Sequence, residues 1–370
     1  MSLAARIAAA AAGTAGVAAT GAALGVVRHR KRAIDRRAGL GPGEPPLGSL
    51  RAPARTVVAT DGVPLHVEVD EPEHPDPGAP TVVFVHGYAL NLDCWHFQRL
   101  ALRRLDEAGA GVRAVFYDQR SHGRSGTSSD SGALLGHATI EQLGVDLRTV
   151  IDQVVPDGPI VLVGHSMGGM TVVALAEEHP EMFSPARGGR VAGVALVSTT
   201  AGGLDPSRLL LPLVPARIGG GLTHGAIRLL ARGHRVVDGV RRLGRSVAAV
   251  LTDRFAFGDE VPPEYVEFVD DMLSSTPFEV VAEFFPSFRG LDKFDAVEVM
   301  GQVPTTIICG TDDRLTSIGH SRKLHDRIPG SRLVECPGAG HMVGLERHDE
   351  VDAELLELVR LAGEAQVKRA

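Results

Sequence analysis

Cysteine and tryptophan are scarce in this chain of 370 residues, which has three Cys and one Trp. The cysteines are widely spaced, in apolar or aromatic surroundings: Cys94, Cys309 and Cys336. An odd number of isolated cysteines excludes a disulfide framework and does not fit the ligand spacing of a zinc site. The acidic pairs 270–271 and 312–313 lack the spacing of a calcium loop. We therefore expect neither a metal nor a cofactor.

Lysine is also rare, and arginine carries most of the positive charge. The four lysines are Lys31, Lys293, Lys323 and Lys368. The formal net charge is -7 at pH 7, so a nucleic-acid partner is not expected. Hydrophobic residues make up 44% and charged residues 22% of the chain, which is ordinary for a folded globular protein. The length allows one large α/β domain with an insertion, or two ordinary domains.

Charge is absent from residues 7–27, a run about as long as a membrane-spanning helix. Its Ala, Gly and Thr content makes it only weakly hydrophobic, so a cleaved secretory signal and a loosely associated helix remain alternatives. A basic cluster follows within residues 28–37. Translocation of such a cluster is disfavoured. We expect a membrane anchor with the C-terminal domain in the cytoplasm, the alternative being export after signal cleavage.

Glycine and proline dominate residues 39–53, which are predicted to be a linker, so residues 1–54 form an N-terminal unit outside the folded core. After the linker, strand patterns alternate with helix patterns. Asp61-Gly62 predicts a hairpin between the first two strands. The strands are expected at 55–60, 65–69, 81–85, 112–117, 160–163, 191–197, 305–309 and 331–335. The helices are expected at 95–108, 139–154, 167–178, 317–327 and 346–361. This alternation predicts an α/β fold whose mainly parallel sheet has helices on both faces.

The alternation stops between residues 201 and 290, which are helical in character and punctuated by prolines. Such a stretch is too long for an ordinary loop. We interpret it as an inserted helical cap, and residues 55–200 and 291–370 as the core domain. Its apolar residues, including Phe284, Phe285 and Phe288, would face a substrate or pack on the core.

A Gly-x-Ser-x-Gly motif, formed by Gly164, Ser166 and Gly168, stands between a predicted strand and a predicted helix. A sharp strand-to-helix turn forces the serine into an unfavourable backbone conformation, so small residues must flank it. The turn also lifts the serine hydroxyl clear of the sheet. In this setting the hydroxyl is a candidate nucleophile.

A serine nucleophile needs a histidine to accept its proton and a carboxylate to orient that histidine. Asp312 and Asp313 follow the strand at 305–309, and His341 follows the strand at 331–335. The candidates therefore occur in the order serine, acid, histidine. This order is the one described for α/β-hydrolases and differs from those of chymotrypsin-like and subtilisin-like enzymes.

Over residues 55–362 the chain resembles the α/β-hydrolase superfamily, in the branch with a serine nucleophile. The matching motifs are residues 86–88 (His-Gly-Tyr), 118–125, 164–168, 310–313 (Gly-Thr-Asp-Asp) and 340–341 (Gly-His). The resemblance implies the eight-stranded fold of that family. It also implies a catalytic triad of Ser166, His341 and Asp313, since the family's acid usually lies three residues after the glycine that ends its strand. The backbone amides of Tyr88 and Met167 would form the oxyanion hole.

Other residues that could carry chemistry have structural interpretations. His122 is expected to be structural, and His165 is expected to shape the turn around the serine. Trp95 and Phe97 would either line a substrate pocket or be buried by an amphipathic helix. His96 is expected at the surface.

The leading functional hypothesis is a serine hydrolase that cleaves carboxylic esters through an acyl-enzyme, with a small, apolar acyl substrate. A peptidase, thioesterase, acyltransferase or cofactor-free peroxidase would use the same triad. Family members that open epoxides or remove halides generally have an aspartate nucleophile, so serine disfavours those reactions. A hypothesis of another class is a non-catalytic, membrane-tethered ligand-binding protein of the same fold.

Overall fold

The computed structural model describes residues 30–31, 33, 43–127, 138–204 and 252–367. The apolar run at 7–27 and residues 205–251 of the predicted cap lie outside these ranges. Within them, no helix is both long and apolar enough to cross a membrane.

The sheet has eight strands in the order β1-β2-β4-β3-β5-β6-β7-β8. The strands are β1 (Ala54–Val58), β2 (Pro64–Asp70), β3 (Thr81–Val85), β4 (Ala114–Tyr117), β5 (Ile160–His165), β6 (Val191–Val197), β7 (Thr305–Gly310) and β8 (Arg332–Cys336). β2 pairs antiparallel with both β1 and β4, and the other neighbouring pairs are parallel. The predicted hairpin and the mainly parallel sheet are both confirmed.

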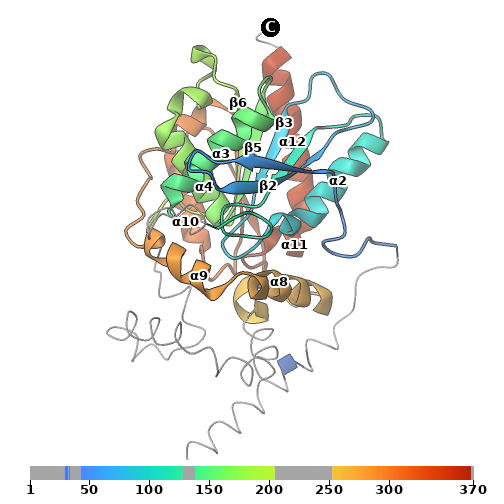
Figure 1. Ribbon diagram of the computed structural model, residues 1–370, viewed down its shortest axis with the longest axis vertical. Helices are drawn as coiled ribbons and strands as arrows, with labels where there is room; N and C mark the ends of the chain where they lie inside the picture. Colours follow the sequence, from blue (N-terminus) through green and yellow to red (C-terminus); the bar gives the residue numbers. More distant parts are fainter. Residues whose placement is uncertain (1–29, 32, 34–42, 128–137, 205–251, 368–370) are drawn as a thin grey trace, which may run out of the picture.

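Helices cover both faces of the sheet (Figure 1). Within the described residues they are α2 (His96–Glu107), α3 (Ile140–Val154), α4 (Met167–Glu178), α8 (Pro263–Ser275), α9 (Phe278–Phe284), α10 (Ile318–Arg327), α11 (Val343–Glu346) and α12 (His348–Val367). The helices α2 and α12 pack with Val82 and Phe84 of β3 on one face. The helices α3, α4 and α10 pack with Val83 and Val85 on the other. Successive residues of a strand point to opposite faces, so one apolar strand serves both cores.

The described part of the predicted cap lies against the loop after β3. The Tyr88 hydroxyl donates a hydrogen bond to the carbonyl of Val281 in α9. The Thr276 hydroxyl, between α8 and α9, donates one to the carbonyl of Ala89 at 3.1 Å. Figure 1 shows α8 and α9 side by side at one end of the molecule. This part of the chain therefore sits over the loop that carries Tyr88.

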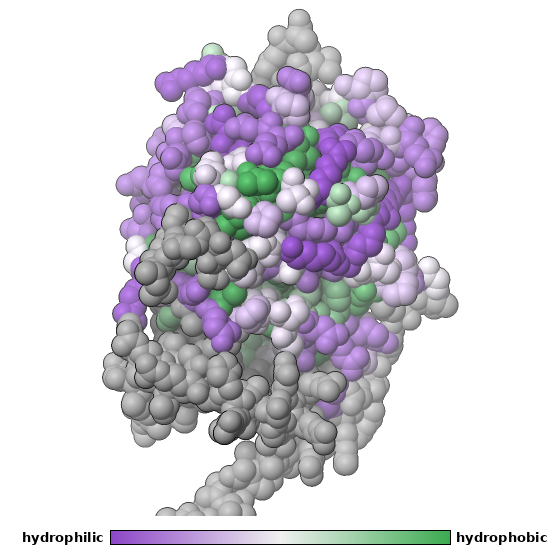
Figure 2. Space-filling view, viewed as in Figure 1, coloured by the Kyte–Doolittle hydropathy of each residue, from purple (hydrophilic) through white to green (hydrophobic). Residues whose placement is uncertain are grey.

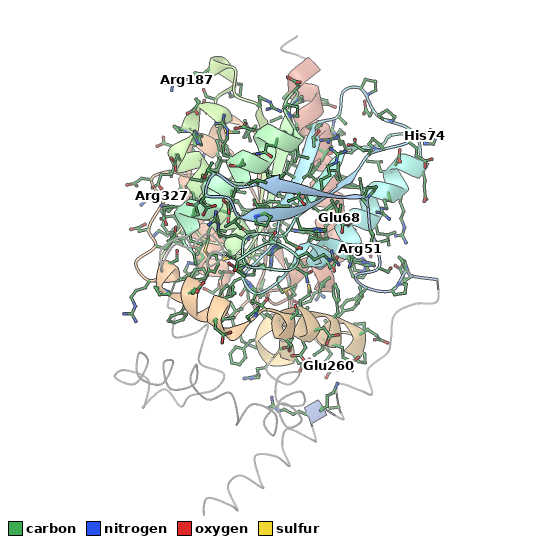
Figure 3. The ribbon with its side chains drawn as sticks, viewed as in Figure 1. Arg51, Glu68, His74, Arg187, Glu260 and Arg327 are labelled. Carbon is green, nitrogen blue, oxygen red and sulfur yellow. The ribbon has the colours of Figure 1, made fainter. Side chains whose placement is uncertain are left out.

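The end of the predicted linker is held on the domain by charged side chains. Arg99 of α2 donates to the carbonyl of Leu50 at 3.1 Å and to the buried carboxylate of Glu68 at 2.8 Å. The same carboxylate oxygen of Glu68 also accepts a hydrogen bond from the backbone amide of Ala52, at 3.1 Å. Figure 3 shows Arg51 close to Glu68, a residue of β2. Because Arg99 of α2 makes hydrogen bonds to both the linker backbone and Glu68, the end of the linker is held alongside α2.

Exposed apolar side chains are scattered on the described surface. Val58 and Leu361 are the large apolar residues that are exposed there, at 53% and 38%. The face seen in Figure 2 is correspondingly mostly hydrophilic, with apolar residues visible between charged ones. Single exposed apolar residues are normal in soluble proteins and do not indicate a docking surface.

A buried ion pair anchors the loop after β4. The Arg120 side chain is 0% exposed and donates two hydrogen bonds of 2.6 Å to Asp146 of α3. A third bond, of 2.7 Å, goes to Asp61 in the β1–β2 turn. We expect Arg120→Ala to lower the free energy of unfolding by about 3–5 kcal/mol, because it leaves Asp146 buried without its partner.

Denaturant unfolding measures this loss, with Arg322→Ala as the matched control. Arg322 forms a bidentate pair with Glu335, but its side chain is 57% exposed. Solvent screens an exposed pair, so its loss should cost much less stability than the loss of the buried pair. Equal losses in the two variants would show that burial of Arg120 has no particular energetic importance.

Candidate active site

Ser166 stands at the turn between β5 and α4, with φ 53° and ψ -119°. A non-glycine residue with positive φ is strained and persists only where its surroundings enforce it. The neighbouring glycines explain how the turn closes. A methyl group on Gly168 would lie 2.0 Å from the carbonyl oxygen of Val85, and one on Gly164 would lie 2.6 Å from that of Gly168. The predicted strand-to-helix elbow is therefore present.

Three side chains from three different connections meet at this turn. The Ser166 Oγ lies 2.9 Å from Nε2 of His341. The Nδ1 of the same ring lies 2.9 Å from Oδ2 of Asp313. Ser166, His341 and Asp313 are 9%, 6% and 4% exposed, so the chain of hydrogen bonds is largely shielded from water. This geometry allows the ring to accept the serine proton while the carboxylate orients it.

The sheet brings these side chains together. β5, β6, β7 and β8 are parallel neighbours, so their carboxyl ends lie along one edge. Ser166 follows β5, Asp313 follows β7 and His341 follows β8. Residues separated by up to 175 positions in the chain are thus in contact.

Asp313, and not Asp312, lies against the histidine. Its Oδ1 accepts hydrogen bonds from the amides of Leu315 and Thr316, at 2.8 and 2.9 Å. Burial alone would raise the pKa of Asp313, but the electrostatic interaction and hydrogen bond with His341 and the hydrogen bonds from Leu315 and Thr316 lower it below its ordinary value. Asp312 is exposed, with its carboxylate 3.2 Å from the Thr311 hydroxyl.

The loop of residues 86–88 lies beside the serine. A methyl group on Gly87 would lie 3.1 Å from Cβ of Ser166 and 2.9 Å from Nδ1 of His165. Only glycine lets the backbone come this close. Within the described part of the chain, neither the Tyr88 amide nor the Met167 amide has a hydrogen-bond acceptor.

Sequence reasoning missed the residues that hold this loop. The backbone amide of Gln119 donates to Nε2 of His86 at 2.9 Å, and the side-chain amide of Gln119 donates to the His86 carbonyl at 2.7 Å. The Thr171 hydroxyl donates to the Gln119 side-chain oxygen at 2.8 Å. Burial lowers the pKa of His86 to about 4, so the ring is neutral and can accept. No local pattern indicated these contacts, because the three residues come from three separate segments.

The two further histidines near the site have structural contacts. His165 Nε2 donates to the carbonyl of His341 at 3.0 Å and so holds the loop that carries that residue. His122 Nδ1 donates to the carbonyl of Arg120 at 2.8 Å. Burial lowers the pKa of both His165 and His122 to about 3, so neither is suited to act as a base at neutral pH.

The expectation that His96 lies at the surface is wrong, because its side chain is 2% exposed. Its ring packs edge-on against Phe97, with centroids 5.3 Å apart. The linker residues Glu44 and Pro45 lie close to it, so chain outside the predicted helix provides the cover. Trp95 and Phe97 are 2% and 4% exposed and belong to the hydrophobic core. Of the two alternatives, lining a substrate pocket or burial by an amphipathic helix, the structure supports burial.

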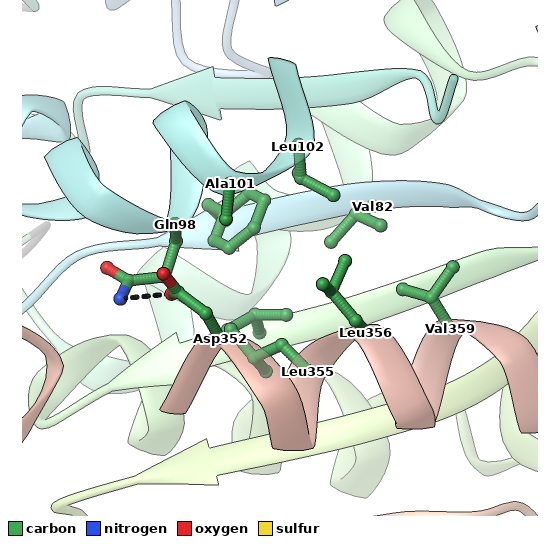
Figure 4. Close-up of a pocket in the computed structure, with 10 residues that line it drawn as sticks. Val82, Gln98, Ala101, Leu102, Asp352, Leu355, Leu356 and Val359 are labelled. Carbon is green, nitrogen blue, oxygen red and sulfur yellow. Dashed lines mark hydrogen bonds between the residues drawn. The ribbon is translucent and has the colours of Figure 1, made fainter. Parts of the chain in front are cut away.

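A small cavity between α2 and α12 does not serve this site. Its volume is about 10 Å³, enough for roughly one water molecule. Figure 4 shows it lined by apolar side chains and by the pair Gln98–Asp352, whose hydrogen bond measures 2.8 Å. Ser166, Asp313 and His341 are not among its lining residues. The cavity is too small for an acyl chain.

Comparison with known proteins finds a family model, related sequences and solved structures that match most of this chain. A family model described as "Alpha/beta hydrolase family" matches residues 82–354. Epoxide hydrolase A of Mycobacterium tuberculosis is 27% identical over 341 residues, which cover 84% of this chain and 98% of that protein. A solved structure of a thermophilic esterase from Thermogutta terrifontis is 25% identical with a TM-score of 0.61, covering 84% of this chain and 100% of the other.

A third similar protein is longer than the match. The dihydrolipoyllysine-residue acetyltransferase component of the acetoin cleaving system of Pseudomonas putida is 24% identical over 284 residues. The match covers 76% of this chain but only 64% of that protein.

Proposed function

The chain belongs to the alpha/beta hydrolase family and is a hydrolase, and from this we propose that it cleaves carboxylic esters with Ser166 as the nucleophile. One observation carries the proposal: the continuous hydrogen-bonded series from Ser166 Oγ through His341 to Asp313, with both contacts at 2.9 Å. A serine hydroxyl is a weak nucleophile without such a base.

The reaction would proceed in two halves. Ser166 Oγ attacks the ester carbonyl while its proton passes to Nε2 of His341, and Asp313 stabilises the imidazolium. The amides of Tyr88 and Met167 would donate to the oxyanion. The C–O bond of the ester then breaks, the alcohol leaves with the proton from His341, and an acyl-enzyme remains. Water attacks the acyl-enzyme, again giving its proton to His341, and the acid is released as the serine recovers its proton.

Apolar side chains near Ser166 support an apolar acyl group. Met167 and Met170 from α4 are buried in one cluster with Phe284 and Phe288 from the predicted cap. Tyr88 packs against this cluster, and its ring lies edge-on to Phe288 with centroids 5.1 Å apart. An acyl chain entering here would be removed from water, and a charged one would be disfavoured.

The similarity to an epoxide hydrolase suggests epoxide hydrolysis as a second candidate reaction, but a serine nucleophile disfavours it. Opening an epoxide with Ser166 Oγ would form an ether. An ether has no carbonyl that water could attack, so the enzyme would be trapped after one turnover. Amide, thioester, acyl-transfer and perhydrolysis reactions pass through the same acyl-enzyme, and they differ in the leaving group or the acceptor.

We expect the wild-type protein to be labelled by a fluorophosphonate and to show a burst with p-nitrophenyl butyrate, because both report an activated serine. Mass spectrometry of the labelled protein should place the adduct on Ser166. A p-nitrophenyl ester of a dicarboxylic acid is the matched substrate, and it should turn over more slowly. A folded protein without label would favour the ligand-binding alternative, and faster turnover of the charged ester would contradict the apolar preference alone.

A further inference from the structure

Glu346 is a partly buried carboxylate for which the proposed reaction has no use. It is the last residue of α11 and follows His341 by five positions. Its Oε1 accepts a hydrogen bond of 2.8 Å from the amide of Gly340, the residue before His341. Its Oε2 accepts one of 2.9 Å from the amide of Gly258. The amide of Asp259 also bonds to this carboxylate.

One carboxylate therefore joins two segments that are far apart in the chain. The first is the loop of residues 337–341, which carries His341. The second is the stretch of residues 256–259, at the start of the described part of the predicted cap. Glu346 accepts from both, and hydrogen bonds to a charged acceptor are about twice as strong as neutral ones.

The backbones of these two segments are in close contact. A methyl group on Gly258 would lie 2.1 Å from the carbonyl oxygen of Gly338, and one on Gly340 would lie 2.4 Å from the amide nitrogen of Gly258. The amide of Met342 donates to the carbonyl of Ala256 at 2.9 Å. With so little room, displacement of 256–259 would displace the histidine loop as well.

Arg347 makes a second connection between the same segments. Its guanidinium donates to the carboxylate of Asp259 and, at 3.0 Å, to the carbonyl of Pro337. The Arg347 side chain is 26% and the Asp259 side chain 51% exposed, so solvent weakens this pair. The Glu346 carboxylate, which is partly buried and accepts from backbone amides of both segments, is the connection tested below.

We propose that Glu346 is a positioning residue: its carboxylate clamps the His341 loop to residues 256–259 and so holds the imidazole at Ser166 and Asp313. The inference rests on the proposed function, since it concerns the base of that reaction. It also links the predicted cap to the base, because residues 256–259 form one side of the clamp.

The clamp depends on the charge of Glu346. A protonated carboxyl would direct an O–H donor at an amide donor and lose one of its bonds. Burial raises the pKa of Glu346 to about 7, although the amides of Gly258, Gly340 and Asp259 and the charge of Arg347 oppose the rise. The ionisable residues next to it are Arg347 and Asp259, which pair with each other. Acidification below about pH 7 should therefore loosen the clamp, whereas an ordinary glutamate would stay charged down to its usual range.

The test is Glu346→Gln, an isosteric change that removes the charge and turns one acceptor into a donor. We expect kcat for p-nitrophenyl butyrate to fall about 10- to 100-fold with little change in KM, as for a small misplacement of a catalytic group. The wild-type rate should fall in acid more steeply than one protonation allows, because protonation of Glu346 adds to the loss of the general base that the reaction requires. The variant should show a single protonation. Glu298→Gln, at an exposed glutamate, is the matched control and should behave as wild type.

Two outcomes would overturn the inference: a variant with wild-type kcat, whether or not its KM changes, or a variant with lower kcat whose rate falls in acid as steeply as that of wild type. If the variant does not fold, the pH dependence of the wild-type rate in acid tests the inference instead. A fall that fits a single protonation would contradict the clamp. The rate at which a fluorophosphonate labels Ser166 in wild type separates the two proposals. Absence of labelling refutes the proposed function, whereas labelling with an unaffected Glu346→Gln variant refutes only the role of Glu346.

Discussion

Replacing Ser166 by alanine is expected to lower kcat for p-nitrophenyl butyrate by about 10⁶-fold, the scale found when the nucleophile of a serine protease is removed. The variant keeps His341 and Asp313 but has no oxygen 2.9 Å from Nε2 to attack the carbonyl. Residual turnover would come only from binding and from the amides beside the serine. Steady-state kinetics with a discontinuous, long-time assay can measure a loss of this size.

The matched control is Ser184→Ala, which removes another buried serine hydroxyl, 6% exposed, from the short turns after α4. It should retain wild-type turnover. Circular dichroism and thermal unfolding should show that both variants are folded. Turnover in Ser166→Ala within tenfold of wild type would exclude the serine mechanism, whatever turnover the control variant shows.

Asp313→Asn is expected to lower kcat by about 10⁴-fold, as when the triad carboxylate is replaced in a serine protease. The direction follows from the contacts of Asp313. Its Oδ1 accepts from the amides of Leu315 and Thr316, so an asparagine oxygen would take that place and turn its NH₂ towards the ring. To accept a hydrogen bond from this NH₂ group, Nδ1 of His341 would have to be unprotonated, so the ring proton would be on Nε2. In that tautomer Nε2 cannot accept the serine proton.

Asp312→Asn is the matched control, since it makes the same chemical change one residue away. Its carboxylate is exposed and does not contact His341, so we expect less than a threefold change in kcat. Both variants should be assayed with p-nitrophenyl butyrate across neutral to alkaline pH. The reverse ranking of the two variants would show that the loop after β7 is placed wrongly by one residue.

The strand and helix pattern could be predicted because it depends on local properties of the chain. Alternation of short apolar runs with amphipathic segments predicted the parallel sheet, and α4 and β6 have the predicted bounds. The glycines around Ser166 predicted its strained turn, because only small residues fit where strand and helix nearly collide. The order of Ser166, Asp313 and His341 along the chain was likewise readable, since each candidate follows a predicted strand.

Contacts between distant segments could not be read in this way. His96 lies on the outer side of α2 by its pattern, yet linker residues 44–45 bury it. Gln119 and Thr171 hold the loop before Tyr88, and Glu346 joins Gly340 to Gly258, without any motif that marks them. The sequence alone determined the elements and the residue types at the strand ends, because propensity and periodicity act over a few neighbouring residues. Only the tertiary structure decided which polar groups are buried and paired, because a buried hydrogen bond needs a partner that the fold brings from elsewhere in the chain.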